Sequence, residues 1–282
     1  MEIKDFNSID PVAWCPGCGN FGIQGALKAA LAKLGKKPQE LLLVSGIGQA
    51  AKMPHYINAN FFNGLHGRAL PAAAAAKISN RELTVIVTTG DGDCYGEGGN
   101  HFIHNIRRNT DITVIVHDNQ IYGLTKGQAS PTSEPGMKTK IQPGGVILTP
   151  FPPLEMALAL GCGFVARGYA AEREHLAELI LAGINYNGFS LIDVFQPCVS
   201  FNKLNTFEWY SKRVYKVGAE HDASNKVSAM ALAAEMERLP IGIIYKKEKP
   251  SYSELSGLDG MKPLVDADIG NIDISPAFSD FS

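Results

Sequence analysis

The stretch LTVIVTTGDGD, residues 83–93, decides how this sequence folds, because an apolar run passes directly into a turn of glycine and aspartate. The apolar residues 83–89 are continuous rather than alternating, which is typical of a strand buried on both faces of a parallel sheet. Gly90 and Gly92 let the backbone approach a phosphate closely, and the start of a following helix adds its dipole. The stretch therefore predicts a buried strand that ends in an anion-binding turn.

Further apolar runs predict three more strands, with helical patterns between them. These strands are residues 41–45 (LLLVS), 112–117 (ITVIVH) and 191–195 (LIDVF). Helices are predicted over residues 22–34, 70–78, 100–108, 153–160 and 172–185. Strands that alternate with helices of this length indicate an α/β fold, namely a doubly wound, mostly parallel sheet with right-handed crossovers.

The remaining sequence predicts a long loop and a C-terminal extension. Residues 125–153 are rich in Gly, Pro, Ser and Thr, which favours a long functional loop. After residue 201 we expect a helix (225–239), a short apolar run (241–245) and a polar tail from about residue 250, lying on the surface or on a partner. The predicted division is an α/β domain over residues 1–200 and an extension over residues 201–282, packed on that domain or on a partner subunit.

The bulk composition excludes several classes of protein. The chain has 282 residues, of which 45% are hydrophobic, so it can bury a large core. Charged residues make up 19% and the net charge is −2, which argues against a nucleic-acid-binding surface. The sequence shows neither a membrane span nor a secretory signal. We therefore expect a cytoplasmic protein whose five cysteines serve thiol, metal or cluster chemistry rather than disulfides.

A second polar turn follows the next predicted strand and completes a candidate metal site. Asp118 and Asn119 come after residues 112–117, about one strand–helix–strand unit beyond Asp91. The carboxyl ends of neighbouring parallel strands lie at the same edge of a sheet, so Asp91 and Asn119 can reach one cation there. Carboxylate and amide oxygens suit Mg²⁺ shared with phosphate. Asp-Gly alone is ordinary turn chemistry, and it is the pairing with Asn119 that favours a diphosphate site.

These motifs resemble those of thiamine-diphosphate-dependent enzymes, and further blocks narrow the resemblance. GDGDCYGEGGNHFIHNIRRN (90–109) and NQIYGLTKGQASPTS (119–133) are similar to the beta subunit of 2-oxoacid:ferredoxin oxidoreductases. So are WCPGCGNFGI (14–23), SGIG (45–48), HGRALP (66–71) and QPCVSFN (196–202), in the order of that family. The resemblance implies a thiamine-diphosphate-binding fold and the oxidative decarboxylation of a 2-oxoacid to its acyl-CoA, with ferredoxin as electron acceptor.

The resemblance also assigns residues to the cofactor site. It implies that Asp91, Asn119 and the main-chain carbonyl of Ile121 hold Mg²⁺. Other residues are implied to line the thiazolium and diphosphate region or to close over the diphosphate, namely Ile47, Gly48, Gln49, Ala50, His66, Gly67, Gly90, Gly92, Asp93, Gly123 and Leu124. The alternative for His66 is an ordinary loop histidine, and its HGR context favours the cofactor site.

The motif Cys15-Pro-Gly-Cys18 is compatible with half a zinc site, a thiol redox pair or half an iron–sulfur site. A second CxxC is missing, which weakens zinc, and no βαβ unit precedes the motif as in thioredoxins. The resemblance implies a [4Fe-4S] cluster bound by Cys15, Cys18, Cys198 and a cysteine directly after SGIG. At that last position this chain has Gln49.

The substitution at Gln49 leaves three hypotheses for the cluster, since a neutral amide is a poor replacement for a thiolate on iron. The cluster survives with an unusual fourth ligand, Cys94 or Cys162 substitutes, or the cluster is labile or absent. The sequence QPC at residues 196–198 agrees with the family pattern, which favours the presence of a cluster. Otherwise, we interpret Cys94 and Cys162 as small packing residues.

The resemblance implies that part of the enzyme lies on another chain. The glutamate that activates thiamine diphosphate belongs to the pyrimidine-binding domain of an alpha subunit, and Glu97 sits in the wrong half of the site to replace it. We therefore expect activity only with an alpha subunit, in an αβ heterodimer or (αβ)₂, with ferredoxin, CoA and a 2-oxoacid as further partners.

The substrate prediction depends on Lys52 and on the YGLTKGQ block. The alternative interpretation of Lys52 is an ordinary surface lysine. In 2-oxoglutarate-using relatives, however, a basic residue near this position could meet the distal carboxylate of the substrate. We favour 2-oxoglutarate, with pyruvate and branched-chain 2-oxoacids left open. A non-redox thiamine-dependent synthase or decarboxylase is the alternative enzyme, and a zinc-binding module is the non-enzymatic one. Both leave part of the motif set unexplained.

Overall fold

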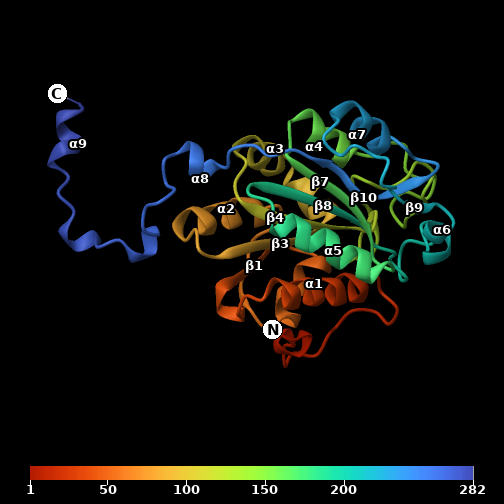
Figure 1. Ribbon diagram of the computed structural model, residues 1–282. Coiled ribbons are helices and arrows are strands. Elements are labelled where there is room, and N and C mark those ends of the chain that lie inside the picture. Colours follow the sequence, from red (N-terminus) through yellow and green to blue (C-terminus); the bar gives the residue numbers. More distant parts are fainter. Residues whose placement is uncertain (282) are drawn as a thin grey trace.

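Two layers of helices enclose an eight-stranded sheet in the computed structural model, which describes residues 1–281 (Figure 1). The strand order is β2-β1-β3-β4-β8-β7-β10-β9. The strands are β1 (Leu41–Ser45), β2 (Asn60–Asn63), β3 (Thr84–Gly90), β4 (Ile112–Asp118), β7 (Phe164–Tyr169), β8 (Phe189–Phe195), β9 (Val214–Lys216) and β10 (Leu239–Lys246). Neighbours are parallel except β7 and β10, which are antiparallel.

The helical layers divide the core between the two faces of the sheet. Helices α1 (Asn20–Leu34) and α5 (Arg173–Ile184) pack on one face. The other face is covered by α2 (Ala69–Ser79), α3 (Gly99–Arg108), α4 (Pro153–Ala159) and α7 (Lys226–Ala233). Side chains at alternate positions along a strand pack in the cores on opposite faces of the sheet. Ile86 and Ile115 pack under the first helical layer, and Val87 and Val114 pack under the second. Each central strand is therefore apolar on both faces, as its continuous pattern predicts.

The register of β3 and β4 positions the candidate site. Gly90 at the end of β3 pairs with His117 near the end of β4, so the turns after these two strands leave the sheet side by side. A π-helical turn, Gly92–Glu97, joins β3 to α3. The loop after β4 begins with the short ladder of β5 (Ile121–Tyr122) and β6 (Gln128–Ala129) and has no further strand or helix before α4.

The predicted doubly wound, mostly parallel α/β fold is confirmed. The strand predicted over residues 41–45 is β1 to the residue, and those at 83–89, 112–117 and 191–195 correspond to β3, β4 and β8. The predicted helices correspond to α1 to α5 within two residues at each end. The helix predicted over residues 225–239 is too long, since α7 ends at Ala233 and Leu239 already belongs to β10. Strands β2, β7 and β9 of this sheet were not predicted, and the apolar run expected at residues 241–245 lies within β10.

The C-terminal region completes the sheet and then leaves it. Strands β9 and β10 extend the sheet beyond β7, with α6 (Phe207–Ser211) beside them. Helix α8 (Tyr252–Leu255) follows, and Tyr252 donates a backbone hydrogen bond to Asn109 at the end of α3. From there the chain runs outward to α9 (Ser275–Ser279) (Figure 1). The division into an α/β domain over residues 1–200 and an extension over residues 201–282 stays a prediction.

The described residues also form short 3₁₀ segments. The 3₁₀ segments are Ile3–Phe6, Pro38–Glu40, Ala50–Tyr56, Leu264–Asp266 and Ile269–Asn271. Within residues 1–281, no helix combines the length and the apolar character that crossing a membrane requires.

Helix α1 contains two glycines whose surroundings differ, and this difference yields a stability prediction. A methyl group at Gly22 would lie 1.9 Å from the carbonyl oxygen of Ala170, whereas at Gly25 it would meet nothing closer than the Arg173 side chain at 4.0 Å. Gly22→Ala should therefore lower the free energy of unfolding by about 1–3 kcal/mol through overpacking. Gly25→Ala should raise it by about 0.5–1 kcal/mol, because alanine has the higher helix propensity.

Urea unfolding followed by circular dichroism measures both changes, with the second variant as the control for the first. Equal effects of the two substitutions would show that the contact between α1 and Ala170 is not as close as described.

Candidate functional site

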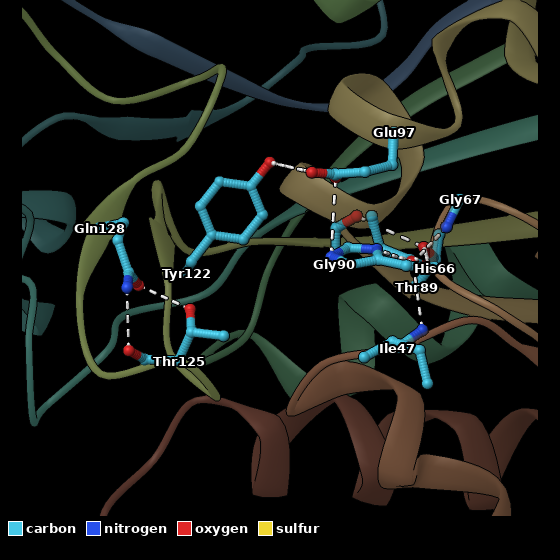
Figure 2. A network of polar contacts seen from close by, with 10 residues as sticks. Ile47, His66, Gly67, Thr89, Gly90, Glu97, Tyr122, Thr125 and Gln128 are labelled. Atoms are coloured by element: carbon cyan, nitrogen blue, oxygen red, sulfur yellow. Dashed lines mark hydrogen bonds and ion pairs between the residues drawn. The ribbon is translucent and has the colours of Figure 1, made fainter.

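A pocket lies where the turns after β1, β3 and β4 meet at the carboxyl edge of the sheet. It is lined by Ile47, Gly48, Gln49, Ala50, His66, Gly90, Asp91, Gly92, Asp93, Asn119, Ile121, Tyr122, Gly123, Leu124 and Thr125. Figure 2 shows part of this region, with His66 and Ile47 on one side and Tyr122 and Thr125 on the other. Segments far apart in the sequence thus surround one space, which we call the cofactor pocket.

The carboxylate of Asp93 fixes three of these segments. Its Oδ1 accepts hydrogen bonds from the backbone N–H groups of Ile47 at 3.1 Å and Gly67 at 2.8 Å, and lies 2.6 Å from His66 Nδ1. Its Oδ2 accepts a hydrogen bond from Thr89 Oγ1 at 2.6 Å. The side chain is buried. Asp93 therefore connects the loop after β1, the loop before α2 and the end of β3.

Tyr122 closes one side of the pocket. Its hydroxyl donates to Glu97 Oε2 at 3.1 Å, and the same carboxylate oxygen lies 3.7 Å from His66 Nε2 (Figure 2). Burial and the nearby Glu97 carboxylate raise the pKa of Tyr122, so it remains a hydrogen-bond donor at neutral pH. A Cβ at Gly92 would come within 2.2 Å of this ring, so glycine is required for Tyr122 to lie here.

Asp91 and Asn119 lie at the pocket as the sequence predicts. Asp91 is buried, and its Oδ2 accepts hydrogen bonds from Ser130 and, at 2.7 Å, from Thr132. Asn119 Oδ1 accepts from the N–H of Ile121 at 3.0 Å, which holds the turn after β4. Burial raises the pKa of Asp91 to about 6, against the opposing effect of the two hydroxyl donors.

Two further buried aspartates lie next to this site and leave it rich in carboxylates. The hydroxyl of Thr132 also lies 2.7 Å from Asp118 Oδ1, and Tyr95 donates to Asp193 at 2.7 Å. Burial raises the pKa of Asp118 and of Asp193, while the Arg167 guanidinium opposes this in both cases. Such a concentration of buried carboxylates fits the binding of a cation, because a positive charge removes the cost of keeping them ionised.

Nearly all residues predicted for the thiamine and magnesium site line this pocket. The exception is Gly67, which lies behind it with its N–H bonded to Asp93. Sequence reasoning missed Tyr122, Thr125, Ser130 and Thr132, although the block from 119 to 133 contains all four. The predicted substrate residue Lys52 is half-buried in the segment after Ala50 and does not line the pocket.

A second cavity adjoins the first and contains the three matched cysteines. It is lined by Trp14, Cys15, Cys18, Asn20, Gln49, Asn119, Gly123, Gln196, Cys198, Val199, Ser200 and Phe201. We call it the cysteine cavity. Burial, and then the neighbouring thiols of Cys198 and Cys15, raise the pKa of Cys18 to about 11. Three thiols in one cavity fit the soft ligand set of an iron–sulfur cluster.

The other two cysteines lie elsewhere. Cys94 and Cys162 are both buried in the core under α2, α3, α4 and α7. Within residues 1–281, the His, Cys, Asp and Glu side chains form no group of three or more arranged to hold a metal ion. The thiols of Cys15, Cys18 and Cys198 thus share a cavity without converging on one point in the chain alone.

The fold and the site correspond to a known family. Residues 44–194 match the family described as thiamine pyrophosphate enzyme, C-terminal TPP binding domain. Residues 198–258 match the family that describes the C-terminal part of the pyruvate ferredoxin oxidoreductase beta subunit. The 2-oxoacid:ferredoxin oxidoreductase subunit beta from Saccharolobus solfataricus is 46% identical over 256 residues, which cover 86% of this chain and 84% of that one. This chain belongs to the 2-oxoacid:ferredoxin oxidoreductase beta subunits.

Two further relatives of this beta subunit are named after a substrate. The 2-oxoglutarate synthase subunit KorB of Methanocaldococcus jannaschii is 35% identical over 245 residues, covering 86% of this chain and 91% of that one. A solved 2-oxoglutarate:ferredoxin oxidoreductase from Magnetococcus marinus, with 2-oxoglutarate, coenzyme A and succinyl-CoA bound, is also similar. The two structures agree with a TM-score of 0.93 at 35% sequence identity. The match covers 100% of this chain and 96% of that one. The predicted family and enzyme class are confirmed.

Replacing Asp93 by asparagine should loosen the cofactor pocket of this beta subunit. The amide nitrogen cannot accept a hydrogen bond, so at least one of the donors Ile47, Gly67 and Thr89 loses its acceptor. We expect a loss of about 1–3 kcal/mol in the free energy of unfolding. Hydrogen exchange of the Ile47 and Gly67 amides should become faster.

Hydrogen exchange measured by mass spectrometry checks both segments at once. Asp259→Asn, the same substitution in the exposed tail, is the control and should leave exchange at the pocket unchanged. Unchanged protection of both loops in the Asp93 variant would contradict the role given to this carboxylate.

Proposed function

We propose that this beta subunit binds thiamine diphosphate and Mg²⁺ in the cofactor pocket and, with an alpha subunit, oxidises 2-oxoglutarate to succinyl-CoA and CO₂. Two electrons leave through an iron–sulfur cluster in the cysteine cavity to ferredoxin. The substrate is supported by the similarity to the KorB subunits and to the Magnetococcus marinus enzyme, whose structure holds 2-oxoglutarate and succinyl-CoA. We also propose that the complex works in the cytoplasm.

One observation carries the proposal: Asp91, Asn119 and Ile121, from the ends of neighbouring parallel strands, line a single pocket. Their carboxylate, amide and carbonyl oxygens are the hard ligands that Mg²⁺ takes when it also binds phosphate oxygens. The surrounding excess of buried carboxylates fits a cation at this point. Gly90 and Gly92 leave the backbone of the turn open to the diphosphate.

The protein residues around the cofactor serve to bind and orient it. Thiamine diphosphate supplies the electron sink for decarboxylation, and the protein supplies its position and electrostatics. Asp93 keeps the loops at Ile47 and Gly67 in place around the pocket. The ring of Tyr122, held by Glu97, covers one side and excludes water there.

The cysteine cavity is placed to receive the electrons. Gln49, Asn119 and Gly123 line both this cavity and the cofactor pocket, so the two spaces share one wall. A cluster bound by Cys15, Cys18 and Cys198 would therefore lie one residue away from the cofactor, a position that suits direct electron transfer. We propose a [4Fe-4S] cluster here.

An alpha subunit is proposed because, among the described residues, the carboxylates at the cofactor pocket all have other roles. Among the pocket residues, Asp91 is assigned to Mg²⁺ and Asp93 is saturated by protein donors. Glu97 accepts the hydrogen bond of Tyr122 at the phosphate-binding end. We therefore propose, as the family resemblance implies, that the activating glutamate belongs to the alpha subunit and that the active enzyme is an αβ heterodimer or (αβ)₂.

Activity should consequently depend on assembly. The purified chain should show no turnover, whereas the anaerobic complex with its alpha subunit should reduce ferredoxin or methyl viologen only when both 2-oxoglutarate and CoA are present. Spectrophotometric assays that omit each component in turn measure this dependence. Turnover by the isolated chain, or reduction without CoA, would refute the proposed reaction.

Although Lys52 does not line the cofactor pocket, we propose that it sets the substrate preference of the assembled complex. A charge-assisted hydrogen bond to the distal carboxylate of 2-oxoglutarate is worth about 1.5–3 kcal/mol, so Lys52→Ala should raise KM for that acid roughly 10- to 100-fold. Pyruvate has no distal carboxylate, so its KM should hardly change. Lys37→Ala, an exposed lysine away from the pocket, is the control. Equal effects on both acids would remove Lys52 from substrate recognition.

A further inference from the structure

Gln49 lies between the two cavities of the proposed site. It lines the cysteine cavity together with Cys15, Cys18 and Cys198, and it also lines the cofactor pocket. Its main-chain carbonyl accepts a hydrogen bond from Trp14 Nε1 at 2.8 Å, which fixes the backbone beside the CxxC motif. The side chain therefore starts from a fixed point in the wall that separates the cofactor from the thiols.

The side-chain oxygen of Gln49 is buried and has no hydrogen-bond partner within the described part of the chain. A buried carbonyl oxygen without a partner costs free energy, and such an atom calls for an explanation such as a ligand or ion. Neighbouring polar groups do not use it: Gln196 donates to the carbonyl of Pro197 at 2.8 Å, and Ser200 donates to Cys15 Sγ at 3.0 Å.

A fourth thiol is not available to this cavity. Cys162 is fully buried, and its Sγ donates to the carbonyl oxygens of Phe164 and Phe189. Cys94 packs in the same core as Phe102, on the face of the sheet opposite to the Trp14 core. For Cys94 or Cys162 to bind the cluster in place of the missing cysteine, its side chain would have to leave this packed core.

We propose that Cys15, Cys18 and Cys198 bind three iron atoms of the cluster as thiolates and that the Gln49 amide oxygen faces the fourth. This inference rests on the proposed iron–sulfur function and adds to it the identity of the group that faces the fourth iron atom. A hard, neutral oxygen binds iron of such a cluster more weakly than a thiolate does. One iron is therefore held less firmly than the other three.

Two consequences follow from this ligand set. First, mild oxidation should remove that iron: [4Fe-4S]²⁺ gives [3Fe-4S]⁺, Fe²⁺ and one electron, which the added oxidant takes up. Second, the cluster with its ligands carries one negative charge fewer than a cluster with four thiolates. Its reduction potential is therefore higher, because net charge is one of the factors that set the potential of such clusters.

The test uses the complete anaerobic complex, oxidised with ferricyanide, with iron and sulfide counted and EPR spectra recorded before and after. The wild-type complex should lose one iron in four, retain its sulfide, and develop the [3Fe-4S]⁺ signal. Gln49→Cys should keep all four irons under the same treatment and shift the reduction potential to a lower value. Cys162→Ala is the control and should behave as the wild type.

The Gln49→Leu variant distinguishes between two roles of the Gln49 oxygen: a ligand of iron, or a buried oxygen that merely lacks a partner. The leucine removes the oxygen at similar volume, so the fourth iron should be lost already during purification, giving three irons per cluster. If the oxygen has no role at the cluster, the variant should instead raise Tm and leave the iron count unchanged, which would overturn the inference.

The remaining outcomes are also decisive. A wild-type cluster that keeps four irons after oxidation, with the same potential as the Gln49→Cys complex, would overturn the inference while leaving the proposed redox function intact. Absence of iron from the wild-type and the Gln49→Cys complexes alike would overturn the cluster assignment itself. Loss of iron in the Cys198→Ala complex supports the three-thiolate arrangement.

Discussion

Asp93 accepts hydrogen bonds from the loop after β1, from the loop before α2 and from the end of β3, so that one buried carboxylate holds together three walls of the cofactor pocket. This arrangement also demands small residues around it. A Cβ at Gly46 would approach the Asp93 carboxylate within 2.2 Å, and one at Gly67 would lie 2.5 Å from the backbone at Glu97. Gly46 of SGIG is thus required by close packing against Asp93, and Gly67 of HGR by close packing against the backbone at Glu97.

The second constraint is the concentration of negative charge at the carboxyl edge of the sheet. Asp91, Asp118 and Asp193 are all buried there, and their pKa values are raised primarily by burial. Hydroxyl groups offset part of the cost by donating hydrogen bonds, as Ser130 and Thr132 do at Asp91 and Tyr95 does at Asp193. A cation would remove more of it. Under the proposed function, this edge is unfavourable in the chain alone and would become favourable when Mg²⁺ and the diphosphate bind.

The sequence predicted the fold from local patterns, whereas most of the residues that line the cofactor pocket were assigned by the family resemblance. Continuous apolar runs identified β1, β3, β4 and β8, but β7 was missed because Arg167 and Gly168 interrupt its run, although Arg167 packs over Phe195. Strand β2, NFFN, is exposed on the edge of the sheet and has no apolar pattern. The roles of Asp93 and Tyr122 could not be predicted, because their hydrogen bonds join segments distant in the chain. The place of Gln49 was predicted by resemblance, whereas its unpaired oxygen required the structure.

The shared wall of the two cavities would connect the chemistry of the proposed cofactor to that of the proposed cluster. Gln49 lines both spaces, so a change at this residue acts at once on the cofactor pocket and on the cysteine cavity. In the proposed ligand set, a cluster with one neutral ligand would accept electrons from the cofactor more readily and give them up to ferredoxin less readily than one with four thiolates. These two effects act on successive electron-transfer steps, and neither changes the equilibrium between substrates and products. The loss of a single thiolate would thus shift the rates of the two electron transfers without altering any residue proposed to bind the diphosphate.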